Sequence, residues 1–281
     1  MKYKSVLTCM FLLIARFAES ATLEYKQVDY LPAGYAYDPL TGKNLVLTGE
    51  IKTGDAKKLL AMLLDPKPLV LLSVIVDSPG GSVDEAIKIA KLVKSLYVTV
   101  SVKPNGNCAS ACFFIFLAGS GRGASPAELM GTDALLPNRG PLPLPGFVGL
   151  HRPFLTRIDS FNNKQSDAMR FVASYLEGEL LPRRLIDLMM SKPSNDIYWL
   201  REDDLAEIGD YPPEQEEYLI QKCNYDRNYF SKAGAARNQG NRSTVKKLLD
   251  QKRKEMECTV YVTLEAHNAT MRKLKRGWLP Y

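Results

Sequence analysis

Ser110 is the residue whose neighbours point most directly to chemistry. It lies between two alanines, after the turn-forming residues 103–106 and at the start of an apolar run that reaches Gly119. Small neighbours would let a substrate carbonyl approach the hydroxyl, and the backbone N–H of Ala111 could point at a developing oxyanion. The same position would suit a helix N-cap, because a serine there accepts hydrogen bonds from the amides of the first turn. This stretch alone leaves both interpretations open, a nucleophile and a cap.

Two further segments carry residues that could serve such a nucleophile. His151 follows the short apolar segment 147–150, and a histidine delivered by a strand in this way could be a general base. The alternative is a surface or core histidine without chemistry. The other histidine, His267, lies in a charged C-terminal region, and we assign it no role. Gly80 and Gly81 lie between a predicted strand and a predicted helix, where glycine lets the backbone approach a ligand and expose an amide to it.

Strand and helix patterns alternate in the segments that must hold these residues. The predicted strands are residues 44–51, 69–76 and 96–102, and the helices between them are residues 55–64 and 83–95. The continuous apolar run 69–76 predicts a strand that is covered on both faces. This order is typical of a parallel sheet in an α/β domain. Because sites gather at the carboxyl ends of parallel strands, the glycine turn and Ser110 should share one edge of the sheet.

The segments outside this core are a leader, a loop and further helices. Residues 22–43 carry aromatic and turn residues with little periodicity, and we expect an irregular leader that packs on the core. Residues 120–146 are rich in Gly, Pro and Ser, which predicts a long loop over the site, and such loops are often functional lids. The remaining patterns predict helices over residues 158–176, 183–190 and 201–208, and a short strand over residues 195–200 that opens with the carboxylate of Asp196.

The N-terminal residues have the pattern of a secretory signal peptide. Lys2 and Lys4 precede an apolar run over residues 6–17, and cleavage is expected near Ser20 or Ala21. A membrane anchor is the alternative, but about 20 apolar residues are needed to cross a bilayer. We therefore expect an exported mature protein, either periplasmic or secreted.

Length and composition predict a globular protein in three parts. The chain has 281 residues, of which 46% are hydrophobic, which is enough for a large core. We expect a signal peptide over residues 1–21, an α/β domain over residues 22–212 and a basic helical extension over residues 213–281. Neither a metal-ligand cluster nor a phosphate-binding loop is apparent in the sequence, so we expect no metal and no cofactor.

The C-terminal extension carries the basic excess of the chain. Residues 213–281 hold 14 Lys and Arg against 8 Asp and Glu, and this excess equals the formal net charge of the whole chain, +6. Helical patterns cover residues 214–233 and 244–256. A charge excess on such helices is usually a solvated face, and a weak contact with an anionic surface is the alternative. We expect no nucleic acid partner.

Four cysteines remain once the signal peptide is removed: Cys108, Cys112, Cys223 and Cys258. An oxidising compartment permits disulfides, and four cysteines allow three connectivities. We favour a disulfide between Cys223 and Cys258, which would join two helices of the extension. Cys108 and Cys112 would straddle Ser110 if they were paired. Because Cys108 should precede the helix, we expect both to be small buried hydrophobic residues instead.

Four motifs together resemble the Clp protease proteolytic subunit superfamily, the serine peptidases of the ClpP/crotonase fold. More narrowly, the chain resembles exported bacterial relatives whose nucleophile turn carries flanking cysteines. The motifs are Asp77-Ser78-Pro79-Gly80-Gly81, Ala109-Ser110-Ala111, Leu150-His151-Arg152-Pro153 and Asn195-Asp196-Ile197-Tyr198-Trp199-Leu200. They follow one another in the family's order within residues 44–210. The resemblance implies a core of repeated β-β-α units with a parallel sheet.

The resemblance also assigns roles to individual residues. It implies that Ser110 is the nucleophile, that His151 is its base and that Asp196 orients the imidazole. The backbone N–H groups of Gly81 and Ala111 would form the oxyanion hole. We therefore expect a serine endopeptidase that acts on peptides or proteins through an acyl-enzyme and assembles into a homo-oligomer.

Two departures from the family pattern support an alternative function. Asp77 stands where the family has Asn, and the segment between Ser110 and His151 is longer than is usual in the family. The alternative is a catalytically inactive module that binds peptides or serves assembly. A Ser-Lys dyad, as in the signal peptide peptidases of this fold, would need Lys103 or Lys192, and neither lies in a matching motif. An acyl-CoA enzyme does not fit an exported protein.

Overall fold

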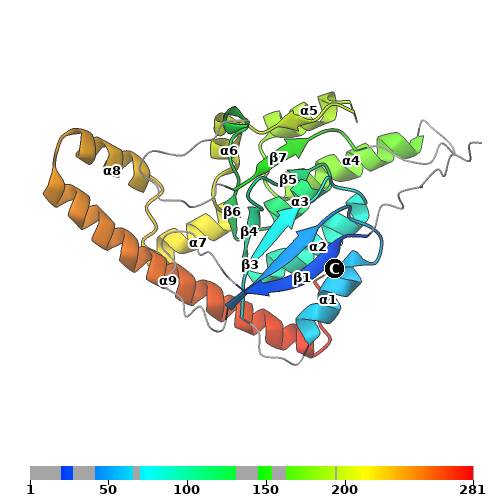
Figure 1. Cartoon of the computed structure of the whole chain (residues 1–281), viewed down its shortest axis with the longest axis horizontal. Helices are drawn as coiled ribbons and strands as arrows, with labels where there is room; N and C mark the ends of the chain where they lie inside the picture. Colours follow the sequence, from blue (N-terminus) through cyan, green and yellow to red (C-terminus); the bar gives the residue numbers. More distant parts are fainter. Residues whose placement is uncertain are drawn as a thin grey trace, which may run out of the picture.

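A sheet of five strands forms the centre of the computed structural model, in the order β1-β2-β3-β4-β6 (Figure 1). Its strands are β1 (Thr22–Gln27), β2 (Gly42–Thr48), β3 (Val70–Asp77), β4 (Thr99–Val102) and β6 (Gly121–Gly123). β2, β3, β4 and β6 pair in parallel, and β1 pairs antiparallel with β2. The predicted α/β class with a mostly parallel sheet is confirmed.

The structure describes residues 20–27, 42–65, 70–130, 145–153, 163–193 and 195–280. Most of the predicted signal peptide, residues 28–41 of the predicted leader, residues 131–144 of the predicted loop 120–146 and the start of the helix predicted from residue 158 lie outside these ranges. Ser20 and Ala21, where cleavage is expected, lie directly before β1. The Ser20 hydroxyl donates a hydrogen bond to the Asp55 carboxylate (2.6 Å), and Ala21 is buried.

Two strands of the sheet occupy segments that were predicted to be irregular. β1 lies in the predicted leader and pairs with β2 over its whole length, and β6 lies at the start of the predicted loop. Both are edge strands with one hydrogen-bonded neighbour. Such strands can be short and partly solvated, so little apolar periodicity marks them in the sequence.

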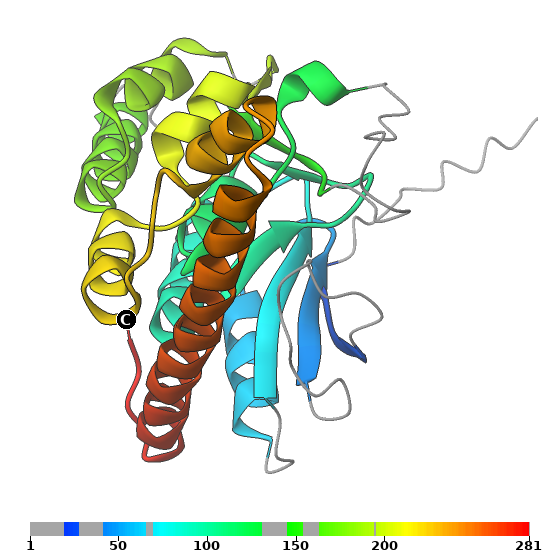
Figure 2. The same cartoon turned by 90° about the vertical axis from the view of Figure 1, so that its left-hand side faces the viewer.

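The sheet carries its main apolar core against helices on one face (Figure 2). α1 (Asp55–Leu64) and α2 (Val83–Leu96) follow the predicted bounds closely. Val74 and Val76 of β3 belong to the same buried cluster as Leu92 of α2, whereas Ile75 is only half-buried. The prediction that this strand is covered on both faces was therefore wrong in part.

A second, smaller sheet carries the segments that matter for the site. It consists of β5 (Asn107–Ala109), β7 (Phe147–Leu150) and β8 (Tyr198–Trp199), with β5 parallel and β8 antiparallel to β7. β5 was not predicted as a strand, because three residues show no periodicity. It is followed by the fully buried helix α3 (Cys112–Leu117). A parallel bridge between Ser78 and Cys108 links the two sheets.

The remaining helices of the domain agree with the predicted ones where the structure describes them. They are α4 (Asn163–Gly178), α5 (Arg183–Ser191) and α6 (Glu202–Ile208), and a short 3-10 helix covers Ala127–Leu129. Gly209 ends α6, as its position in the sequence predicts. The predicted strand 195–200 shrinks to the two residues of β8.

The C-terminal extension differs from the prediction in where its helices begin and end. It forms α7 (Pro213–Cys223), α8 (Tyr229–Asn238) and α9 (Arg242–Lys275). The predicted helix 214–233 is interrupted because Asn224 adopts the left-handed conformation (φ 55°) and ends α7. The predicted helix 244–256 continues for nearly twenty residues more, and α9 runs along the domain on the same side as α2 (Figures 1 and 2).

Two features tie α9 to the rest of the molecule. A disulfide joins Cys223 of α7 to Cys258 of α9, the pair favoured from the sequence. His267 is buried, and its Nδ1 lies 2.9 Å from the carbonyl oxygen of Leu96 at the end of α2. This histidine, to which the sequence assigned no role, therefore anchors the extension on the domain. Within the described ranges no helix is long and apolar enough to cross a bilayer.

Candidate active site

The carboxyl ends of three strands meet at one edge of the two linked sheets. β5 pairs in parallel with β7, so that Ala109 lies beside Gly149. Ser78, the residue that follows β3, bridges Cys108 in the same direction. The segments that leave these strands are the glycine turn after β3, Ser110 after β5 and His151 after β7. The tertiary structure thus brings together three of the predicted site segments.

Ser110 occupies a left-handed turn between β5 and α3. Its φ is 55°, a conformation that is uncommon for residues other than glycine and that clusters at functional sites. The Ser110 N–H donates to the carbonyl oxygen of Gly149 (3.0 Å), and its own carbonyl accepts from the N–H of Phe113 (3.0 Å). Within the described residues its hydroxyl makes no hydrogen bond. The N-cap position of α3 is Ala111, so Ser110 does not serve as the cap.

The glycine turn packs directly on this serine turn. A Cβ on Gly80 would lie 2.6 Å from the Cβ of Ser110 and 2.7 Å from the carbonyl oxygen of Ala109. A Cβ on Gly81 would lie 2.2 Å from the carbonyl oxygen of Ile51. Both glycines have positive φ, 101° and 134°. Only residues without a side chain fit this close approach of two backbones.

Two backbone donors in these turns remain uncommitted. Two hydrogen bonds fix the chain on either side of Gly81. The N–H of Ile51 donates to the carbonyl oxygen of Gly80, and the N–H of Ser82 donates to the carbonyl oxygen of Ile51. The N–H of Gly81 itself makes no hydrogen bond to any described residue, and neither does the N–H of Ala111. These are the two amides that the family resemblance assigned to an oxyanion hole.

His151 is buried at the end of β7, with 7% of its surface exposed. Its Nδ1 lies 2.8 Å from the carbonyl oxygen of Arg152. A carbonyl oxygen can only accept, so Nδ1 must carry the hydrogen, and in the neutral ring Nε2 is then the basic nitrogen. Ala109 pairs with Gly149, so the same register places Leu150 beside Ser110. His151 is the next residue along the chain.

Asp196 lies before β8, and its carboxylate contacts a lysine. The pairing of β7 with β8 ends at Leu150 and Tyr198, and beyond it the N–H of Arg152 donates to the carbonyl oxygen of Lys192 (3.1 Å). The Asp196 side chain is 57% exposed and lies 3.8 Å from the ammonium group of Lys192. Among the interactions found for the described residues, none joins Asp196 to His151.

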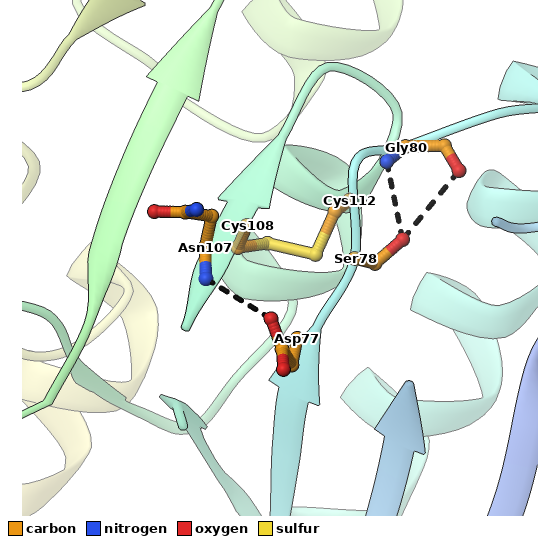
Figure 3. Close-up of a disulfide and its surroundings, with 6 residues drawn as sticks. All are labelled: Asp77, Ser78, Gly80, Asn107, Cys108 and Cys112. Carbon is orange, nitrogen blue, oxygen red and sulfur yellow. Dashed lines mark hydrogen bonds between the residues drawn. A yellow bond between two sulfur atoms is a disulfide. The ribbon is translucent and has the colours of Figure 1, made fainter. Parts of the chain in front are cut away.

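Asp77, the residue that departs from the family pattern, has a structural role. One carboxylate oxygen accepts a hydrogen bond from the N–H of Asn107 (3.2 Å; Figure 3). The other lies 3.2 Å from the Lys103 ammonium group. The carboxylate therefore ties the end of β3 to the start of β5. Lys103 and Lys192, the two candidate bases of a Ser-Lys dyad, each pair with an aspartate in the described structure.

Cys108 and Cys112 form a disulfide, contrary to the prediction that they are separate buried thiols. Their Cα atoms are 5.2 Å apart, because the left-handed turn at Ser110 brings the end of β5 back toward the start of α3. Figure 3 shows the disulfide beside the Ser78–Gly80 turn. The spacing of four residues around a serine was the available sequence signal for this pair.

The far end of α3 is also fixed. The Arg122 guanidinium donates to the carbonyl oxygens of Leu117, at the end of α3, and of Ile208, at the end of α6. Burial lowers the pKa of Arg122 to about 10, although Glu179 and Asp210 oppose the shift. The group remains charged at neutral pH, where it complements the carboxyl-terminal ends of both helices. No motif or periodicity in the sequence singled out Arg122.

One protein family model matches part of the chain. The family model of Clp protease matches residues 36–128, a segment that includes the glycine turn and Ser110 and ends before His151. A search among curated proteins found no match.

Several solved structures are similar to the fold at low sequence identity. ClpP1 from Listeria monocytogenes is 18% identical, with a TM-score of 0.42 over 60% of this chain and 88% of that chain. A mutant of the 1510-N membrane-bound stomatin-specific protease is 14% identical, with a TM-score of 0.40 over 64% and 83%. The human mitochondrial delta3-delta2-enoyl-CoA isomerase is 13% identical, with a TM-score of 0.36 over 92% and 99%. The family match shows that the segment 36–128 of this chain is similar to Clp protease.

Proposed function

We propose that the protein is a serine hydrolase, and specifically a peptidase, in which Ser110 forms an acyl-enzyme. The observation that carries the proposal is the meeting of the glycine turn, the left-handed turn at Ser110 and the buried His151 at the ends of adjacent parallel strands. The choice of peptides as substrates rests on the similarity to Clp protease.

In the proposed reaction the Ser110 hydroxyl attacks the carbonyl carbon of a peptide bond while Nε2 of His151 accepts the hydroxyl proton. The same nitrogen then gives the proton to the leaving amine as the C–N bond breaks, and an ester to Ser110 remains. A water molecule, deprotonated by His151, hydrolyses the ester and regenerates the serine. The uncommitted N–H groups of Gly81 and Ala111 are the proposed donors to the tetrahedral oxyanion.

Two groups are candidates to orient the imidazole. The family resemblance proposes Asp196, whose carboxylate would have to turn from Lys192 toward the ring. The carbonyl oxygen of Arg152 already accepts from Nδ1, and a backbone carbonyl can fix the tautomer of a histidine. The proposal for Asp196 is therefore tested separately from that for Ser110 and His151.

The alternative function, a catalytically inactive module that binds peptides or serves assembly, has less support than the hydrolase. It was motivated by two departures from the family pattern, the change at Asp77 and the long segment between Ser110 and His151. The hydrogen bond and ion pair of the Asp77 carboxylate account for the first without loss of the site, and much of the long segment lies outside the described residues.

We further propose that the protein works outside the cytoplasm. Two disulfides support this location, because thiols are kept reduced in the cytoplasm. The pattern of the first 21 residues is the second support. Fractionation of cells that produce the full chain, followed by N-terminal sequencing, would test this, and an intact N-terminus in the cytosolic fraction would contradict it.

Self-association is proposed from the family resemblance and from exposed apolar side chains. Phe171 on α4 and Leu180 after it expose about half of their surface, 52% and 56%. Surfaces of this kind are often contact sites. Light scattering after gel filtration should give a mass above 31.4 kDa for wild type and a smaller mass for Phe171→Glu.

Activity-probe labelling tests the central proposal. A fluorophosphonate should label purified protein at Ser110, as located by mass spectrometry, and Ser110→Ala and His151→Ala should abolish the labelling. Ser174→Ala, which changes a serine on the solvent side of α4, is the matched control and should label normally. Folded wild-type protein that takes up no probe, and that hydrolyses no peptide or casein substrate, would overturn the assignment.

A further inference from the structure

We propose that the Cys108–Cys112 disulfide is the positioning element that holds Ser110 in its reactive conformation. The inference rests on the proposed function, since it concerns the reactivity of the same serine. It assigns to these cysteines a role in the chemistry, beyond that of a general stabilising cross-link.

The disulfide closes a loop that has Ser110 at its centre. Cys108 is the middle residue of β5 and Cys112 is the first residue of α3, so the link joins a strand to the helix that leaves it. Both cysteines have no exposed surface. The link therefore belongs to the buried base of the turn, and the serine lies at its partly exposed tip.

Apart from the disulfide, no side chain of the described residues restrains the turn by a hydrogen bond. Ser110 is in the left-handed region, which is strained for a residue with a Cβ. α3 has six residues and no side-chain cap at its start. Ala109 and Ala111 carry no side-chain group that could bond the turn in place. The other contacts of the turn are backbone hydrogen bonds and the packing of Gly80: the N–H groups of Ser110 and Ala109 donate to the carbonyl oxygens of Gly149 and Ser78, and the Ser110 and Ala111 carbonyl oxygens accept from Phe113 and Phe114.

Relaxation of this turn would affect two groups needed for the reaction. If Ser110 moved to the right-handed region, α3 could extend backward by a residue, and both the hydroxyl and the N–H of Ala111 would change direction. Displacements of about 1 Å can cost about 100-fold in rate when reacting groups must be aligned. The disulfide removes this alternative by limiting the distance between the two ends of the turn.

The second disulfide of the chain provides a matched control. Cys223–Cys258 joins α7 to α9 in the extension and encloses a longer stretch, with a sequence separation of 35 against 4. Removal of either disulfide by a double Cys→Ala substitution changes the same number of atoms. Only the Cys108–Cys112 pair is covalently joined around the serine.

The experiment compares Cys108→Ala/Cys112→Ala with Cys223→Ala/Cys258→Ala. The rate of fluorophosphonate labelling of Ser110 is measured over a range of probe concentrations, so that the limiting rate constant is separated from probe binding. Amide hydrogen exchange of residues 107–113 is followed in the same samples, and circular dichroism verifies folding. Cys108→Ser/Cys112→Ser, which keeps the side-chain size more closely, serves if the alanine pair does not fold.

We expect the limiting labelling rate to fall by about tenfold or more in the Cys108/Cys112 variant, with probe binding unchanged, and to stay within about twofold of wild type in the Cys223/Cys258 variant. The rate of amide hydrogen exchange at Ser110 should rise in the Cys108/Cys112 variant and stay unchanged in the Cys223/Cys258 variant. A folded Cys108/Cys112 variant with wild-type labelling and exchange overturns the inference. If wild type itself is not labelled, the proposed function fails, and the exchange data alone decide: faster exchange supports the positioning role and unchanged exchange refutes it.

Discussion

Gly80 lies so close to Ser110 that a Cβ on the glycine would come within 2.6 Å of the serine's own Cβ. The same atom would lie 2.9 Å from the nitrogen of Ala111, a proposed oxyanion donor. The two turns therefore cannot move independently, and the position of Ser110, the proposed nucleophile, depends on a residue in another crossover of the sheet.

A methyl group at position 80 should inactivate the protein. Gly80→Ala would force the two turns apart, and we expect labelling of Ser110 to slow by about 100-fold, since a shift of about 1 Å can have that effect. The matched control is Gly54→Ala: Gly54 has nearly the same φ, 102° against 101°, but no atom within 4 Å of its Cβ position. The Gly54→Ala substitution imposes the same backbone strain, about 1–2 kcal/mol, but its Cβ clashes with no other atom. Equal labelling of the two variants would contradict the close packing.

Replacement of Asp196 by asparagine should have a modest effect on the serine's reactivity. Nδ1 of His151 already donates to the Arg152 carbonyl oxygen, and Asp196 is exposed beside Lys192. We expect Asp196→Asn to slow labelling by less than about tenfold, whereas loss of a carboxylate that holds the base costs about 10⁴-fold in a Ser-His-Asp triad. His151→Ala, measured in parallel, sets the scale. A loss with Asp196→Asn as large as that with His151→Ala would establish the carboxylate as the orienting group.

The two disulfides should rank in opposite order for stability and for reactivity. Cross-links restrict the unfolded chain more when the loop is longer, so the sequence separations of 4 and 35 correspond to roughly 2 and 4 kcal/mol. Chemical denaturation should therefore show the larger loss for Cys223→Ala/Cys258→Ala. The variant at Cys108 and Cys112 should be the more stable of the two, yet the less reactive. If one variant had both the lower stability and the slower labelling, partial unfolding would explain both results, and the opposite ranking would be refuted.

Stability should fall below neutral pH because of His267. The ring is 3% exposed, its Nε2 has no hydrogen-bond partner among the described residues, and burial lowers its pKa below the usual 6.5. Below pH ~6.5 the unfolded chain takes up a proton that the folded chain resists, so stability is constant above that pH and decreases as the pH falls, by up to about 1.4 kcal/mol per pH unit.

His267→Gln tests this pH dependence. Denaturation midpoints between pH 8 and pH 5.5 should show a smaller slope for the variant than for wild type. The substitution changes no other titratable group, so the difference in slope belongs to His267. Parallel curves for the two proteins would refute the assignment.

Local patterns in the sequence were sufficient for the elements whose burial repeats regularly. α1, α2, α5 and α6 lie within one or two residues of their predicted bounds, since each has apolar residues at helical spacing and a recognisable start or end. The glycine turn, Ser110 and His151 were identified from residue types next to predicted strand ends. Both kinds of signal depend on residues within a few positions of one another.

Other features depended on contacts between distant segments. β1 and β5 are strands because of their partners β2 and β7, and their own residues show little periodicity. The length of α9 follows from buried contacts such as that of His267 with α2, and the Cys108–Cys112 bond follows from the left-handed turn between them.

The sequence by itself determined the fold class and the residues that could do chemistry, because periodicity, turn residues and motif spacing are local properties. The tertiary structure decided which of those residues meet: it brings the glycine turn and His151 to Ser110, pairs Asp196 with Lys192, and closes a disulfide around the serine. The physical reason is that strand register and side-chain packing join positions separated by tens of residues, and no local pattern records which of them come together.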